Sequence, residues 1–349
     1  MSIIGGEFDL DFDRLLGTQN TTFLGRGFLY SSGRAAFYHI LLSIKEYMPK
    51  IKTLMLPDYI CSSIINIALK SGFEIIYYPI SNSLQINYSI FRTLYTKTSA
   101  VLLVNYFGLI SLEEQVRFLR EIDDDICIIE DNVQSFFSMY NDLKCDFSFT
   151  SFRKTFPVPD GSLVVTKHKL TLPFFDNTFA QYKIAGGVLK GLRSNNCFDD
   201  QLYLDLLEKG EEYIDINLES RMSDITSTLL SGIDLQRIAL LRKRNAKYLT
   251  DGLSALGMEP LIPYKKEFVP LFIPIWLENR DNIRNFFFNN SIYCPVHWPV
   301  SNNTPKLLKG EELSKHELSL IIDQRYSLKD MDMILTLLED SLHAHSISR

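Results

Sequence analysis

The amino-acid sequence predicts an α/β fold with a mainly parallel central sheet flanked by helices and a smaller C-terminal α/β domain. Short apolar runs of strand length alternate along the chain with segments whose apolar residues recur at helical spacing. Strands separated by helices form βαβ units, and such units build parallel sheets. The chain has 349 residues, 46% of them hydrophobic, which is enough for roughly two domains. We expect a large domain over residues 1–232 and a small one over 233–349.

The first half of the chain carries the clearest alternation. A helix is expected at 33–48 because Ser31 and Ser32, which can cap a helix, precede its apolar pattern. The apolar run 51–56 predicts a buried strand that stops at Pro57. Further helices are expected at 60–70 and about 111–121. Further strands are expected at 73–80, 100–107, 126–130, 146–152 and 161–166.

The second half is predicted to be mostly helical at first. Residues 167–220 are polar and helical in pattern, with Gly186, Gly187 and Gly191 as breakers. A long helix is expected at 222–252, where it would lead into the C-terminal domain. That domain contains the apolar stretches 268–277 and 295–300 and a last helix at 327–342.

Composition excludes several classes of function. Lys+Arg 36 against Asp+Glu 42 gives a charge of −6, and no long basic run suggests nucleic-acid binding. No segment approaches the roughly 18–20 apolar residues of a membrane span, and the acidic start MSIIGGEFDLDFDR does not resemble a secretory signal. Five scattered cysteines without a CxxC argue against a disulfide framework or a metal site. We therefore expect a cytoplasmic protein that binds no nucleic acid, membrane or metal.

The common motifs GxGxxG, GxxxxGK[ST], GxSxG and HExxH are absent, and polar residues gather instead in three segments. The first segment, Ser31-Ser32-Gly33-Arg34, lies at a predicted helix N-terminus. Free backbone N–H groups and the helix dipole suit an anion such as phosphate at that point. An ordinary helix cap is the alternative interpretation.

The other two segments follow predicted strands, and ligands bind at the carboxyl ends of parallel strands. Glu130 and Asp131 end one strand, with Gln134 three residues later. A carboxylate there can keep a pyridinium nitrogen protonated, or it can simply cap a helix. Lys154 follows another strand and precedes a proline-constrained turn closed by Asp160. A lysine held in a partly desolvated pocket can form a Schiff base, and a surface lysine beside a turn is the alternative.

Taken together, these segments resemble the DegT/DnrJ/StrS family of sugar aminotransferases, which depend on pyridoxal 5'-phosphate (PLP) and have fold type I. The matching stretches run in family order from about residue 24 to 300: SGRAAFYHIL, LPDYICSSIINIALKSGFEIIYYPI, VLLVNYFG, IIEDNVQSF, FSFTSFRKTFPVPDGSLVVT, NLESRMSD and IYCPVHWP. The resemblance implies the PLP-dependent transferase fold, PLP as cofactor, and a homodimer whose subunits complete each other's active sites.

The resemblance also implies roles for residues around the cofactor. Lys154 is the equivalent of the lysine that binds the cofactor covalently and acts as general acid and base. Asp131 is the equivalent of the partner of the pyridine nitrogen, and Gln134 is similar to a glutamine near the ring hydroxyl. Gly33 and Arg34 fall where the family binds the phosphate, although Arg34 replaces the usual threonine or serine.

For some other contacts the resemblance implies alternative residues. Ser148 or Ser151 would add a contact to the phosphate. Tyr59 or Cys61 falls where members often place an aromatic ring over the cofactor, and if Cys61 is the equivalent position, Tyr59 would substitute for it. Arg221 lies in a segment that family dimers lend to the neighbouring active site.

The implied reaction is amino transfer to a nucleotide-linked keto-sugar, with glutamate or glutamine as the amino donor, in polysaccharide or glycoconjugate precursor synthesis. His297 is expected to line the substrate pocket. Because the chain is acidic overall, a nucleotide diphosphate would need a local basic patch. The candidates for that patch are Arg153, Lys183, Lys190, Arg193 and Arg221.

One departure from the family pattern concerns the lysine itself. The family places a serine five residues before the lysine and an Asp-Gly seven after it, and both counts, from Ser148 and from Asp160, reach Arg153. Compensating one-residue shifts would restore Lys154, and we prefer that alignment because arginine cannot bind the cofactor covalently. A PLP-dependent sugar dehydratase and a non-catalytic protein that binds a sugar nucleotide or a partner stay open as alternatives.

Overall fold

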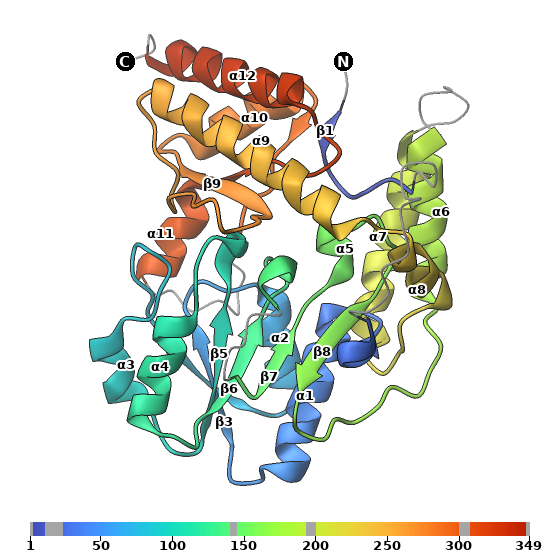
Figure 1. Cartoon of the computed structure of the whole chain (residues 1–349), viewed down its shortest axis with the longest axis vertical. Coiled ribbons are helices and arrows are strands. Elements are labelled where there is room, and N and C mark those ends of the chain that lie inside the picture. Colours follow the sequence, from blue (N-terminus) through green and yellow to red (C-terminus); the bar gives the residue numbers. More distant parts are fainter. Residues whose placement is uncertain (1–2, 11–23, 140–144, 193–199, 300–307, 347–349) are drawn as a thin grey trace.

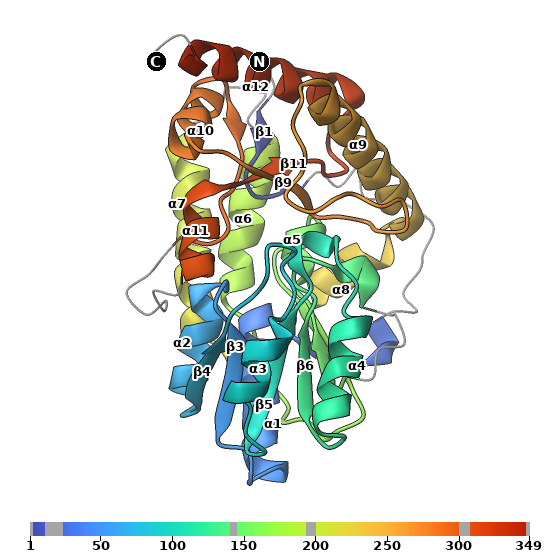
Figure 2. The same ribbon diagram turned by 90° about the vertical axis from the view of Figure 1, so that its left-hand side faces the viewer.

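The computed structural model describes residues 3–10, 24–139, 145–192, 200–299 and 308–346. A large central sheet has helices on both faces, and a smaller α/β unit lies above it in the view of Figure 1. The quarter turn of Figure 2 shows the same two layers of helices from the side. The predicted fold class, a mainly parallel sheet flanked by helices, is confirmed.

The central sheet has seven strands in the order β2-β8-β7-β6-β5-β3-β4. Their bounds are β2 (Phe28–Tyr30), β3 (Thr53–Pro57), β4 (Glu74–Tyr78), β5 (Ser99–Val104), β6 (Cys127–Asp131), β7 (Phe147–Phe149) and β8 (Ser162–Thr166). Strands β3 to β7 are parallel, and β8 is antiparallel to both of its neighbours. The carboxyl ends of β5, β6 and β7 therefore meet at one edge, where ligands bind in sheets of this kind.

The helices divide between the two faces as right-handed crossovers require. The chain moves in one direction across the sheet from β3 to β4 and in the other from β4 to β5. Right-handed connections then place the helix after β3 and the helix after β4 on opposite faces. One face carries α1 (Gly33–Tyr47) and α2 (Ser62–Lys70), and the other carries α3 (Tyr88–Leu94) and α4 (Glu113–Ile122).

The smaller unit is built from the C-terminal third and from the start of the chain. Its elements are β1 (Ile4–Gly5), α9 (Leu235–Ala255), β9 (Phe272–Trp276), α10 (Arg280–Asn289), β10 (Ile292–Tyr293), α11 (Leu308–His316), β11 (Glu317–Ile321) and α12 (Leu328–Ser346). Strand β9 pairs antiparallel with β11, and β1 pairs parallel with β10. The residues just after β1 therefore pass between the two units. A domain division at residue 232 stays a prediction.

Two long helices, α6 (Phe179–Gly191) and α7 (Asp200–Ile216), pack against each other beside the sheet. The prediction that Gly186 and Gly187 break a helix is wrong, because both lie inside α6. A Cβ on Gly186 would lie 2.8 Å from Leu207 of α7, and a Cβ on Gly187 would lie 2.9 Å from Leu10. These glycines thus permit close packing. Gly191, by contrast, is the last residue of α6, as expected.

The single helix expected at 222–252 is also wrong. The segment forms α8 (Asp224–Ser231) and then α9, with a break at Gly232. Asp234 starts the second helix by accepting a hydrogen bond from the Arg237 N–H at 2.9 Å, so a new cap outweighs the continuous apolar pattern. None of the helices within the described ranges is both long and apolar enough to cross a membrane.

Candidate functional site

Buried polar side chains gather at the carboxyl ends of β5 and β6. Asp131 is the last residue of β6, and Asn105 follows β5 and donates its N–H to the Asp131 carbonyl at 3.0 Å. Gln134 accepts a hydrogen bond from the Phe107 N–H at 2.9 Å through Oε1. The Gln134 Nε2 is buried and has no partner among the described residues, so it is a donor ready for a ligand.

Ser148 and Ser151 lie differently with respect to Asp131. Ser148 pairs with Glu130 across β6 and β7, and its hydroxyl accepts a hydrogen bond from Asn132 at 2.9 Å. Because side chains alternate along a strand, Ser148 and Glu130 lie on the face opposite to Asp131. Ser151 instead starts the short helix α5 (Phe152–Thr155) at the sheet edge.

The N-terminus of α1 lies against this edge. The Ser32 hydroxyl caps the helix by accepting the Ala35 N–H at 3.1 Å. A Cβ on Gly33 would lie 3.3 Å from the Cβ of Ser151 and 3.4 Å from Val133, so the helix start is pressed against the ends of β6 and of the loop before α5. The buried Ser31 hydroxyl has no hydrogen-bond partner in the part of the chain that the structure describes.

The Arg34 side chain does not point toward this edge of the sheet. Its guanidinium forms ion pairs with Glu211 at 2.8 Å and with Asp215 at 3.0 Å, both on α7. A role for Arg34 in binding phosphate would therefore require it to leave these two carboxylates, and the Gly33 backbone is the better-placed part of the segment.

Burial perturbs the two carboxyls at the end of β6. Desolvation raises the pKa of Asp131 from the ordinary 3.8 to about 7, although the Val133 N–H, which donates to Asp131 Oδ1 at 2.9 Å, opposes the shift. Desolvation likewise raises the pKa of Glu130 to about 7, and bonds from Asn132 and Ser148 oppose it. A positive group beside Asp131 would reverse the shift.

These raised pKa values predict that stability falls with pH. Between pH 4 and 7 the folded Asp131 keeps a proton that the unfolded chain has already lost, so its contribution is full below about pH 4 and disappears as pH rises through about 7. Asp131→Asn should remove about 2–4 kcal/mol of that decline in urea unfolding followed between pH 4.5 and 7.5. Parallel pH curves for the two proteins would contradict the assignment.

Lys154 and its neighbour Arg153 are both on α5 but differ in their partners. The Arg153 guanidinium forms an ion pair with Glu211 at 3.2 Å. Lys154 is solvent-exposed on the side that opens into a cavity of about 290 Å³. Burial, and next to it the charge of Arg153, lowers the pKa of Lys154. Although burial opposes it, Glu211 raises the pKa of Arg153, whereas the pKa of Lys154 is lowered, so Lys154 is the more readily deprotonated of the two side chains.

The two candidates for the position over a cofactor ring, Tyr59 and Cys61, are placed differently. Tyr59 is buried between Tyr106 and Trp298, with ring centroids 5.7 and 5.1 Å away, and its hydroxyl donates to the His297 carbonyl. Cys61 directly precedes α2. The Tyr59 ring is thus packed among aromatic side chains, whereas Cys61 lies at the start of a helix.

His297 and Arg221 lie outside the cavity lining. His297 Nδ1 is 2.8 Å from the Ser319 hydroxyl, and its ring centroid is 5.3 Å from that of Phe272, which does line the cavity. Arg221 is exposed and forms an ion pair with Asp176 at 2.6 Å.

The other residues expected in the basic patch differ in where they lie relative to the cavity. Arg153 and Lys183 both line the cavity. Lys190 donates to the Glu7 carbonyl at its rim, and burial lowers its pKa to about 8. Arg193 lies outside the described residues.

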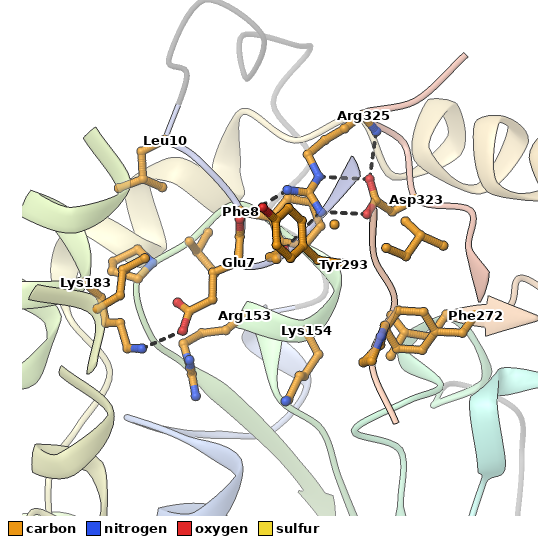
Figure 3. A pocket seen from close by; sticks show the side chains of 18 of the residues that line it. Glu7, Phe8, Leu10, Arg153, Lys154, Lys183, Phe272, Tyr293, Asp323 and Arg325 are labelled. Atoms are coloured by element: carbon orange, nitrogen blue, oxygen red, sulfur yellow. Dashed lines mark hydrogen bonds and ion pairs between the residues drawn. The ribbon is translucent and has the colours of Figure 1, made fainter. Parts of the chain in front are cut away.

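Several residues of the cavity were not expected from the sequence. Figure 3 shows Glu7, from the segment after β1, reaching down between Lys183 and Arg153, with Lys154 beside them. The unexpected residues are Glu7, Glu211, Arg242, Asp323 and Arg325. No motif marks them, because each is one charged residue in an otherwise ordinary polar stretch and the fold alone brings them together.

No family model and no curated protein matches the chain in sequence. Solved structures do match. PseC of Helicobacter pylori, an aminotransferase involved in the biosynthesis of pseudoaminic acid, aligns over 99% of this chain and 100% of its own with a TM-score of 0.71 and 15% identity. The sugar aminotransferase CalS13 of Micromonospora echinospora aligns over 97% and 100% with a TM-score of 0.66 and 12% identity.

NtdA of Bacillus subtilis, solved with bound cofactor PMP, aligns over 93% of this chain and 75% of its own with a TM-score of 0.61 and 17% identity. At such low identities these likenesses establish the fold, which is that of the PLP-dependent aminotransferases of fold type I.

Proposed function

We propose that this chain is a PLP-dependent sugar aminotransferase of the DegT/DnrJ/StrS family. The observation that carries the proposal is the placement of Lys154, whose side chain opens into a cavity lined by residues of α5, α6, α7 and α9 and whose pKa is lowered by burial and by Arg153. Sugar aminotransferases are among the proteins of the same fold, and one protein of that fold was solved with PMP.

The residues at the sheet edge fit PLP. The close approach of Gly33 to Ser151 leaves room only for backbone at the start of α1, and the buried, unpartnered Ser31 hydroxyl supplies a further donor for a phosphate. The unpartnered Gln134 Nε2 suits the ring hydroxyl. Asp131 would hold the ring nitrogen, and the positive charge there would bring the pKa of Asp131 down from about 7.

When bound, PLP supplies an electron sink that stabilises negative charge on the carbon next to the transferred amine. The chain supplies the remaining chemistry. Lys154 holds the cofactor covalently and moves the proton through its Nζ, for which a lowered pKa leaves the amine unprotonated in a larger fraction of molecules at neutral pH. Asp131 keeps the ring nitrogen protonated, and Gln134 orients the ring.

We further propose a nucleotide-linked keto-sugar as amino acceptor, glutamate or glutamine as donor, and a role in cytoplasmic polysaccharide or glycoconjugate precursor synthesis. The cationic cavity lining supports an anionic substrate. A homodimer fits the exposure of Arg221, whose side chain is 64% exposed and pairs with Asp176, which is 80% exposed, so that a neighbouring subunit could recruit it.

The other two hypotheses are less well supported. The resemblance implies a histidine in place of the lysine in the sugar dehydratases, and this chain retains Lys154. Lys154 lines the cavity and has a lowered pKa, which favours a catalytic role over a non-catalytic protein that only binds a sugar nucleotide.

Covalent trapping of PLP tests the proposal. The purified protein is incubated with PLP, its visible absorbance is recorded, the adduct is fixed with borohydride, and the modified peptide is identified by mass spectrometry. We expect a yellow protein modified at Lys154. Lys183, the other lysine of the cavity, is the internal control. Modification at Lys183, or a protein that stays colourless, would overturn the proposal.

A further inference from the structure

The cavity contains an ion pair whose geometry suits exchange with a ligand. Lys183 on α6 is almost fully buried, with 2% of its side chain exposed. Its amine contacts two carboxylates, Glu211 at 3.0 Å and Glu7 at 2.9 Å. A buried ammonium of this kind needs a counterion, because an unpaired charge is costly away from water.

The two carboxylates are not equivalent. Glu211 is shared with Arg34 at 2.8 Å and Arg153 at 3.2 Å, and these charges hold the pKa of Glu211 well below its ordinary value. Three cations thus converge on one carboxylate. Glu7 is the second anion of the group, and Lys183 is its ion-pair partner within the described part of the chain.

Glu7 comes from a different unit of the fold from its partner. It belongs to the N-terminal segment, residues 5–10, which forms one wall of the cavity. Arg325 fixes the backbone of this segment by donating to the Gly6 and Glu7 carbonyls, both at 3.2 Å, and Lys190 donates to the Glu7 carbonyl as well. The backbone is therefore anchored independently of the carboxylate.

The Glu7 side chain itself is only loosely held. It is 44% exposed, and Figure 3 shows its carboxylate projecting into the cavity between Lys183 and Arg153. It can rotate away from Lys183 without moving the anchored backbone, since a glutamate side chain has several rotamers. Lys183 would then face the cavity with its second counterion missing.

We propose that Lys183, with Arg153 beside it, receives the distal carboxylate of a dicarboxylic amino donor, and that Glu7 occupies this place when the cavity is empty. The cavity of about 290 Å³ is of a size for such a small acid. Lys154 opens into the same cavity and would act at the amino end of the donor. The inference rests on the proposed aminotransferase function and specifies its donor.

Calorimetric titration of the purified full-length protein with glutarate tests this inference, because glutarate has both carboxylates but no amine to transfer. Glu7→Gln removes the internal competitor and should tighten glutarate binding by about fivefold. Lys183→Met should weaken it by about tenfold or more.

The matched control is Glu212→Gln, which removes the same charge from an exposed position on α7 outside the cavity lining and should leave glutarate binding unchanged. Lys183→Arg keeps the positive charge that Lys183→Met removes. Thermal melts of both variants distinguish a loss of glutarate binding from a loss of folding. Unchanged or weaker glutarate binding by Glu7→Gln would overturn the inference, as would an effect of Glu7→Gln on inorganic phosphate instead of glutarate. PLP uptake is scored separately by absorbance, so failure of the proposed function remains distinguishable.

Discussion

Lys154→Ala is expected to slow amination of the cofactor by glutamate by roughly 10²–10⁴-fold. The variant loses the amine that we propose to bind the cofactor and carry the proton, while Asp131, Gln134 and the start of α1 keep their places. Stopped-flow absorbance follows this half-reaction without any need to know the sugar acceptor. PLP should still bind, because its phosphate and ring contacts remain, but borohydride should no longer fix it to the protein at this position.

The neighbouring position provides the matched control. Arg153→Lys combined with Lys154→Ala moves the lysine by one residue. It places the lysine at position 153, which an ungapped family alignment favours. We expect this double variant to stay inactive, because the side chain at 153 is directed to Glu211, 3.2 Å away, rather than left free in the cavity. Recovery of the half-reaction would show that the family register applies without shifts and that Lys154 is not the cofactor lysine.

The fold was most predictable where burial is continuous. All six residues of β5 are buried, and the corresponding apolar run in the sequence has no other good explanation than a strand inside a parallel sheet. Strand β11 was missed because it begins with Glu317, a charged residue that is fully buried and hydrogen-bonded to the His297 N–H and the Ser319 hydroxyl. Strand β2 was missed because three residues are too few to show a pattern.

The residues of the candidate site, too, could be predicted from the sequence only in part. Asp131 and Lys154 could be singled out because each lies in a recognisable local segment near the end of a strand, Asp131 as the last residue of β6 and Lys154 shortly after β7. The pairing of Lys183 with Glu7 spans 176 residues, and no local pattern can encode such a contact. The interaction of Arg153 with Glu211, 58 residues away, likewise depends on how the α6–α7 pair packs beside the sheet. Local motifs therefore predicted the residues that we propose to hold the cofactor, while the charged residues of the cavity emerged only from the fold.

Asp160 is expected to contribute more to stability than any other single carboxylate we have described. It is fully buried and accepts hydrogen bonds from the Ser223 N–H at 2.8 Å, the Ser223 hydroxyl at 2.7 Å, and the side chains of Thr226 and Asn177. It therefore joins the turn after α5 to the start of α8 and to the segment before α6. The next residue, Gly161, donates its N–H to the Ser31 carbonyl at 2.6 Å, which links the same turn to the entrance of α1.

Asp160→Ala should therefore lower the free energy of unfolding by about 3–5 kcal/mol, because it leaves these donors, among them the buried Thr226 hydroxyl, without an acceptor. Asp176→Ala is the matched control: it removes the same side chain from the same region, but Asp176 is 80% exposed in its ion pair with Arg221. That change should cost at most about 1 kcal/mol. Urea unfolding of both variants measures the difference, and equal losses would mean that the hydrogen-bonded turn does not organise the site. Since the Gly161 carbonyl of that turn accepts a hydrogen bond from the Phe152 N–H of α5 at 2.9 Å, Asp160→Ala should also bind PLP more weakly at urea concentrations where the variant is still folded.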